Sequence, residues 1–114
     1  MTQVKKWRTY HDDLETFLDW EVHREGADIV FFKINLCTTL AEEVVQVCRY
    51  DTCHGFLHVH RYWLPLEQQT RDLEDPGKPF PSYREAFDAA AADLDANWDD
   101  YCASMKSPKT KKTP

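Results

Sequence analysis

The sequence predicts an α+β fold, a four-stranded antiparallel meander with one long C-terminal helix packed on one face of the sheet. Four segments rich in β-forming residues follow one another through connections too short for a parallel crossover. One later segment places apolar residues at helical spacing. A chain of 114 residues suits a single domain. We expect this domain over residues 1–105, followed by a disordered lysine-rich tail over 106–114.

The first predicted strand rests on alternation of apolar and polar residues, although a short helix over 12–19 is an alternative. The second strand follows a turn around Gly26, and the third follows a connection near 39–42. Residues 1–11 are mixed and polar, and we assign them no strand. A polar, proline-rich connection follows the fourth strand. The four predicted strands are residues 14–22, 29–37, 43–50 and 56–64.

The predicted helix spans residues 83–104. Ser82 and Glu85 have the spacing of a capping box, in which a serine caps the helix and a glutamate follows three residues later. A run of alanines supplies high helix propensity. The apolar residues expected to face the sheet are Phe87, Ala91, Leu94, Trp98, Tyr101 and Met105.

Composition limits the possible classes of protein. No apolar run reaches the length of a membrane span, and no hydrophobic region follows the cationic N-terminus as in a secretory signal. We therefore expect a cytoplasmic protein with reduced thiols, in which Cys37, Cys48 and Cys102 are small buried residues. The net charge of −6 disfavours a nucleic-acid-binding module, because the basic patches are confined to residues 5–8 and the tail.

The most informative stretch is a predicted hairpin from Arg49 to Tyr62, which holds three of the five histidines. Alternate side chains of a strand share a face, so His58 and His60 point the same way, together with Phe56 and Tyr62. The purely apolar residues of the same strand take the core face, and Arg61 falls on that face as well. His54 lies in the turn, whereas Arg49 and Asp51 end the preceding strand.

These residue types suit acid–base cleavage of RNA without a metal or another cofactor. Attack by a ribose 2′-hydroxyl needs a base, an acid and a cation for the phosphate. Histidines titrate near neutrality, and arginine holds phosphate through two hydrogen bonds. The candidate catalytic residues are His58, His60, His54 and Asp51, and the candidate substrate-binding residues are Arg49, Arg61, Tyr50 and Tyr62.

Two other interpretations of the hairpin stay open. Cys53, His54, His58 and His60 are all competent zinc ligands, although they form one cluster rather than two separated pairs. Alternatively, the histidines form a half-polar sheet face that covers the core or meets a protein partner. We expect His11 and His23, outside the cluster, to be ordinary surface residues.

The motif Arg49-Tyr50-Asp51-Thr52-x-His54-Gly55-x-x-His58-x-His60-Arg61-Tyr62 resembles that of small bacterial and archaeal proteins of unknown function. Related families are labelled as toxins of toxin–antitoxin pairs. The resemblance covers roughly residues 7–103 and includes Asn97-Trp98-x-x-Tyr101. Cys53 stands where the motif leads us to expect a small residue, which weakens the metal interpretation. The motif positions carried over are Tyr50, Asp51, His54, Gly55, His58, His60 and Arg61.

The leading hypothesis is a small metal-independent ribonuclease-like toxin. His58 and His60 would act as acid and base, Arg61 or Arg49 would hold the phosphate, and Asp51 would orient a histidine. A cognate antitoxin or other protein is the expected partner and RNA the expected substrate. A homodimer is left open, and no membrane association is expected. The alternative is a non-catalytic interaction domain with an acidic surface.

Overall fold

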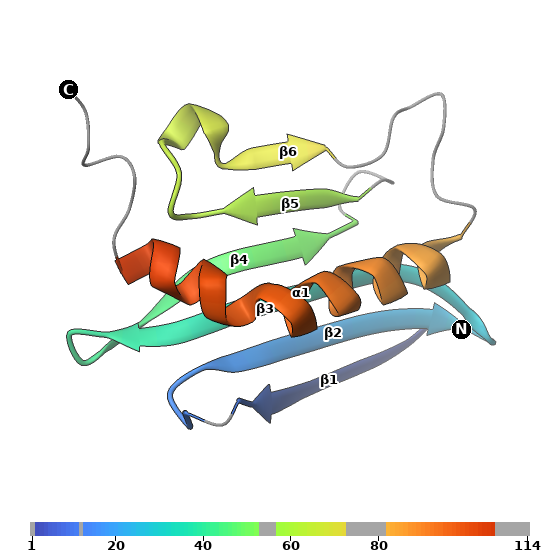
Figure 1. Ribbon diagram of the computed structural model, residues 1–114. Helices are drawn as coiled ribbons and strands as arrows, with labels where there is room; N and C mark the ends of the chain where they lie inside the picture. The colour runs from blue at the N-terminus through green and yellow to red at the C-terminus, as the bar shows by residue number, and fades with distance from the viewer. Residues whose placement is uncertain (1, 12, 53–56, 73–81, 107–114) are drawn as a thin grey trace.

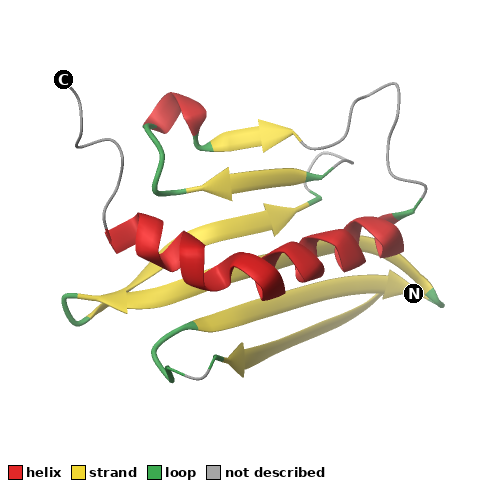
Figure 2. Ribbon diagram, viewed as in Figure 1, coloured by secondary structure: helices red, strands yellow, loops and turns green. Residues whose placement is uncertain are grey.

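Six strands form one antiparallel sheet within the residues that the computed structural model describes, 2–11, 13–52, 57–72 and 82–106. The strands are neighbours in chain order from β1 to β6, so the sheet is a simple meander (Figure 1). The long helix α1 lies across one face of it (Figure 2). The elements are β1 Thr2–Tyr10, β2 Phe17–Glu25, β3 Asp28–Leu40, β4 Glu43–Asp51, β5 His58–Arg61, a 3₁₀ turn Leu66–Gln68, β6 Thr70–Asp72 and α1 Tyr83–Lys106.

The α+β class and the antiparallel meander are confirmed, but the predicted number of four strands was wrong. β1 was missed because it is an edge strand in which only Trp7 is partly buried, so it lacks the apolar alternation of a half-buried strand. It pairs with β2 along its whole length. β6 was missed because three residues are too short to carry a pattern.

The second strand of the sheet begins at Phe17 rather than at Leu14, and the helical alternative is also wrong. Leu14 has a positive φ of 59° and is 76% exposed. The cause is Asp13, whose carboxylate accepts hydrogen bonds from the backbone amides of Glu15 and Thr16 at 2.9 and 2.8 Å. Such a side-chain-to-backbone turn competes with strand pairing and delays the start of β2.

The core lies between α1 and the middle of the sheet. Phe32, Ile34 and Leu36 of β3 are fully buried, and small residues of α1 face them. The predicted helix face was rotated from the observed one, because the buried residues of α1 are Ala86, Ala90, Leu94 and Cys102. Alanine lets the helix approach the sheet, so the larger predicted residues flank the contact and are only partly buried, with Leu94 the exception.

The helix begins as its sequence predicts. The Ser82 hydroxyl accepts a hydrogen bond from the Glu85 amide at 3.2 Å, as an N-cap serine does. The helix continues to Lys106, two residues beyond its expected end, so the first residue of the predicted tail is helical. The rest of that tail, residues 107–114, lies outside the described residues. No helix in the described part of the chain is long and apolar enough to cross a membrane.

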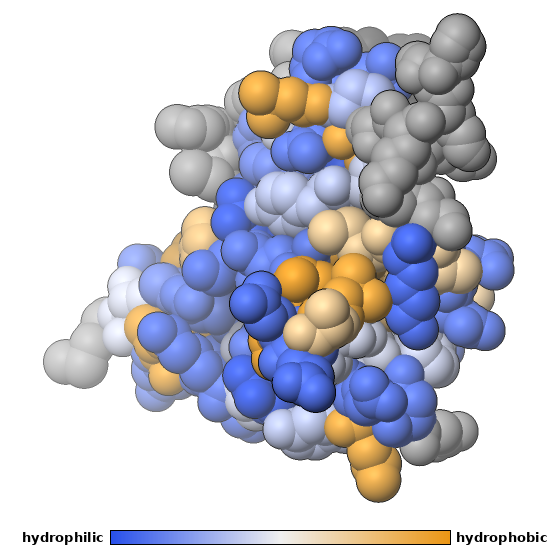
Figure 3. All heavy atoms as spheres, turned by 90° about the vertical axis from the view of Figure 1, so that its left-hand side faces the viewer, coloured by the Kyte–Doolittle hydropathy of each residue, from blue (hydrophilic) through white to orange (hydrophobic). Residues whose placement is uncertain are grey.

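The three predicted buried cysteines are confirmed. Cys37, Cys48 and Cys102 are free thiols with at most 5% exposure. Burial raises the pKa of Cys37 to about 11 and that of Cys48 to about 12. Hydrophobic residues do reach the surface, but Figure 3 shows them as small patches on a largely hydrophilic side of the molecule.

Candidate functional site

The two sheet faces differ in chemistry because alternate residues point to opposite sides. Tyr50 and Val59 are buried against α1, so their neighbours in β4 and β5 point to the face that α1 leaves free, the open face. Arg49 pairs with His60 and Asp51 pairs with His58 across these two strands. The predicted orientation of His58 and His60, away from the core, is confirmed.

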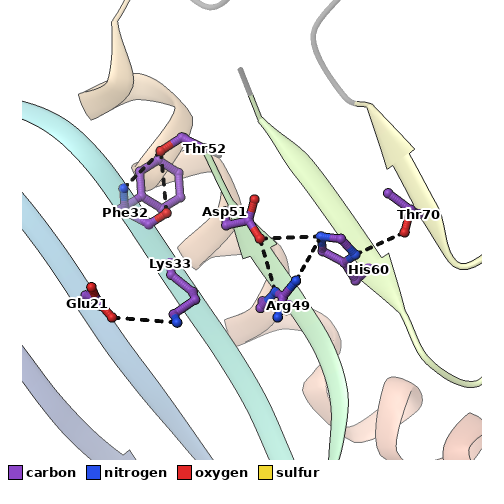
Figure 4. Close-up of polar contacts among 8 residues, drawn as sticks. All are labelled: Glu21, Phe32, Lys33, Arg49, Asp51, Thr52, His60 and Thr70. Carbon is purple, nitrogen blue, oxygen red and sulfur yellow. Dashed lines mark hydrogen bonds and ion pairs between the residues drawn. The ribbon is translucent and has the colours of Figure 1, made fainter. Parts of the chain in front are cut away.

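A four-residue polar cluster, Arg49, Asp51, His60 and Thr70, joins β4, β5 and β6 on the open face (Figure 4). Arg49 Nε donates to Asp51 Oδ2 at 3.1 Å. His60 Nε2 lies 3.4 Å from the same carboxylate oxygen and 3.3 Å from Arg49 Nη2. The other ring nitrogen, Nδ1, lies 3.0 Å from the Thr70 hydroxyl. Both nitrogens of His60 are therefore held.

The Asp51 side chain is only 6% exposed although it lies at the end of a strand. The next residue, Thr52, anchors this strand end to β3. Its hydroxyl accepts from the Phe32 amide at 3.0 Å, and its amide donates to the Phe32 carbonyl at 3.1 Å. These bonds fix the backbone that carries Asp51, so the carboxylate is preorganised beside Arg49 and His60.

His60 is held in an environment that favours its neutral form. Burial and the neighbouring Arg49 guanidinium lower the pKa of His60 below its ordinary value, and they outweigh Asp51, which acts in the opposite direction. Because a guanidinium only donates, its contact with Nε2 fits a ring that is neutral and protonated on Nδ1. If Nε2 is protonated instead, Asp51 is the acceptor within reach.

His58 and Tyr62 complete this part of the open face. The His58 and His60 rings are 6.5 Å apart between centroids, and Tyr62 stacks on His60 with an interplanar angle of 12°. His58 is only partly buried. The structure thus brings His58, His60, Asp51, Arg49 and Tyr62 together.

Two predicted substrate-binding residues point to the helix side instead. The Tyr50 hydroxyl donates to Asp93 of α1 at 2.6 Å, and this contact and burial raise its pKa. Arg61 pairs with the core residue Cys48, and its Nε is buried with no hydrogen-bond partner among the described residues. Alternate residues of a strand point to opposite faces. Tyr50 pairs with Val59 and Arg61 with Cys48, so both side chains lie on the face opposite to the histidines.

The remaining predicted residues belong to the segment that the sequence predicts as a turn. His54, Cys53 and Gly55 fall outside the described residues, so their place relative to His58 and His60 is not given. No group of three or more potential metal ligands occurs within residues 2–11, 13–52, 57–72 and 82–106. Of the four residues proposed for a zinc site, the structure describes His58 and His60.

Sequence reasoning missed two contributors to the polar interactions and one aromatic contact. Thr70 lies in the short strand β6, where no pattern marked it as a partner of His60. Asp93 of α1 accepts from Tyr50 and from Tyr101, the latter at 2.8 Å, and so ties the helix to the sheet. His11 was expected at the surface, yet its ring stacks on Trp98 at 4.0 Å.

Comparison with known proteins gives a family but no activity. A protein-family model described as a domain of unknown function matches residues 2–110. No curated protein matches the chain, and no solved structure matches it.

Proposed function

The chain belongs to this family of domains of unknown function, DUF7718, and we propose that it cleaves RNA without a metal ion, at the histidine cluster of the open face. One observation carries the proposal. Two histidine rings 6.5 Å apart share a face with an arginine and a buried carboxylate. Acid–base cleavage of a phosphodiester needs two proton-transfer groups with a cation beside them.

His60 is suited to act as the base. Its lowered pKa leaves the ring neutral near pH 7. This role requires the tautomer protonated on Nε2, in which Nε2 donates a hydrogen bond to Asp51 and the unprotonated Nδ1 faces the Thr70 hydroxyl. A ribose 2′-hydroxyl in the place of the Thr70 hydroxyl would give its proton to Nδ1 and attack phosphorus.

His58 then acts as the acid, and Arg49 as the cation. The bond from phosphorus to the 5′-oxygen breaks as His58 donates a proton to that oxygen, which leaves a cyclic phosphate and a free hydroxyl. Arg49, 29% exposed in its side chain, reaches the open face and would offset the charge that develops on the phosphoryl oxygens. Tyr62, stacked on His60, offers a ring surface for a base.

The toxin part of the proposal rests on the resemblance of the hairpin motif. A ribonuclease toxin would act in the cytoplasm, be paired with a cognate antitoxin, and stop growth when expressed alone. Growth arrest by the unaltered chain, relieved by the same histidine substitutions that abolish cleavage, would link the two properties.

A second candidate is a non-catalytic interaction domain. Arg49, Asp51, His60 and Thr70 already satisfy one another without a ligand, as residues of a polar sheet face do. The net charge of −6 also suits a basic protein partner. A stoichiometric protein partner with no RNA cleavage would favour this candidate.

The test is cleavage of a labelled RNA in the presence of EDTA. We expect the unaltered protein to produce a cyclic phosphate end, and His58→Ala or His60→Ala to reduce the rate by about 100-fold or more. His23→Ala is the matched control, since His23 lies on β2 and bonds to Glu21 at 2.6 Å. Absence of cleavage by the unaltered protein, or equal rates for all three variants, would refute the proposal.

A further inference from the structure

A hollow lies on the helix side of the sheet, away from the histidine cluster. It has a volume of about 220 Å³ and lies where the first turns of α1 meet β1, β2 and the start of β3. Both apolar and positively charged residues line it. Its apolar lining is Trp7, Val22, Ile29 and Phe87, and its charged lining is Lys5, Arg24 and Arg84.

The apolar floor is a preorganised aromatic surface. Trp7 stacks on Trp20 with ring centroids 5.5 Å apart and an interplanar angle of 2°. The ring centroids of Trp20 and Phe87 are 5.8 Å apart. Phe87 packs edge-on against the fully buried Phe32, with their ring centroids 5.3 Å apart. Trp7 is only partly buried, so this stack extends from the core to the surface of the hollow. A flat aromatic group is a good fit to such a floor.

The rim is cationic on each of its three sides. Lys5 comes from β1, Arg24 from β2 and Arg84 from α1, and no acidic residue is among the lining that the structure describes. Lys5 Nζ lies 5.4 Å from the centre of the Trp7 ring. Arg84 has an ion pair with Asp88 at 3.5 Å, but both side chains are more than 60% exposed, so solvent screens this pair. In a chain of net charge −6, this local positive field is suited to an anion.

We propose that this hollow binds a small aromatic anion, a ring that carries a phosphate or carboxylate group. The ring would lie on Trp7 and Phe87, and the anionic group would face Arg24, Arg84 and Lys5. The proposal is independent of RNA cleavage, because the hollow and the histidine cluster lie on opposite faces of the sheet. At 220 Å³ the hollow is smaller than usual drug-sized pockets, so it suits a ligand of one ring.

Phenyl phosphate is the first probe, and binding is followed by NMR on the indole Nε1–H resonance of Trp7, assigned with Trp7→Phe. We expect saturable binding with a Kd near the millimolar range, as for a ligand of about ten heavy atoms. Benzoate should bind more weakly than phenyl phosphate yet perturb the same resonance. Benzyl alcohol keeps only the aromatic ring, and inorganic phosphate keeps only the anionic group. Each should bind at least about tenfold more weakly than phenyl phosphate.

Neighbouring residues of β1 give a matched control for charge. Lys5→Gln and Lys6→Gln change the net charge equally, but only Lys5 lines this hollow. We expect Lys5→Gln, Arg24→Gln and Arg84→Gln each to weaken phenyl phosphate about threefold to tenfold, and Lys6→Gln to leave it unchanged. Equal affinity for benzyl alcohol and phenyl phosphate, or equal loss in Lys5→Gln and Lys6→Gln, would overturn the proposal.

Discussion

At the scale of single residues, His60 is a polar side chain of the open face with partners at both ring nitrogens. Arg49 and Asp51 contact its Nε2, Thr70 contacts its Nδ1, and the Tyr62 ring stacks nearly parallel to its ring with centroids 6.2 Å apart. Burial and Arg49 lower its pKa below the ordinary value of 6.5. A histidine held neutral in this way couples folding to pH as well as supplying a base.

The pH dependence of stability tests this environment. Below about pH 6.5 the unfolded chain binds a proton that folded His60 resists, so stability is present above this pH and is lost as the pH falls. His60→Gln removes the titrating imidazole and puts a neutral side-chain amide, which can still form hydrogen bonds, in its place. We expect the Tm of the unaltered protein to fall more steeply than that of His60→Gln from about pH 7 to about pH 5. Parallel curves in thermal denaturation by circular dichroism would contradict the assignment.

At the scale of elements, the contact between α1 and β3 depends on small residues. Ala86 and Ala90 are buried to 0% and 1% exposure, and Leu94 fills the next turn of the same stripe. The helix therefore sits close to the sheet, and Asp93 reaches Tyr50 across the gap. Close packing of this kind leaves no room for a larger side chain in the stripe.

Adjacent alanines of α1 make a matched test of that contact. Ala90 faces the sheet, whereas Ala89 is exposed. We expect Ala90→Leu to destabilise the fold by about 1–3 kcal/mol through overpacking. Ala89→Leu should change stability by less than about 0.5 kcal/mol. Urea denaturation measures both, and equal effects would show that the helix does not pack through this stripe.

At the scale of the whole molecule, α1 covers mainly the middle strands of the sheet. β3 has neighbours on both sides and contributes the fully buried side chains of Phe32, Ile34 and Leu36 to the hydrophobic core. β1 and β6 are edge strands, and all but one residue of β1 are exposed. An edge strand with little burial opens at lower free energy than the core of the same sheet.

Amide hydrogen exchange should follow that gradient. We expect the slowest exchange in β3 and β4, and faster exchange in β1 at those amides that hydrogen-bond to β2. Mass spectrometry of peptides from the labelled protein measures both regions in one sample. Protection of β1 equal to that of β3 would mean that β1 is covered by another element or a second molecule.

Much of the fold and part of the site follow from local sequence patterns. Alternation is a property of a single strand, so the sequence by itself determined that His58 and His60 share a face opposite Val59. The Ser82 cap and the start of α1 were determined in the same local way.

Only the tertiary structure decided which side chains meet. The pairing of β4 with β5 set Arg49 and Asp51 against the histidines and left Tyr50 and Arg61 on the helix side. The pairing of β5 with β6 added Thr70, which no sequence pattern marked. Likewise, the cationic hollow exists only where four elements, β1, β2, β3 and α1, converge. The reason is physical: a strand's period is local, but its register and neighbours depend on distant parts of the chain.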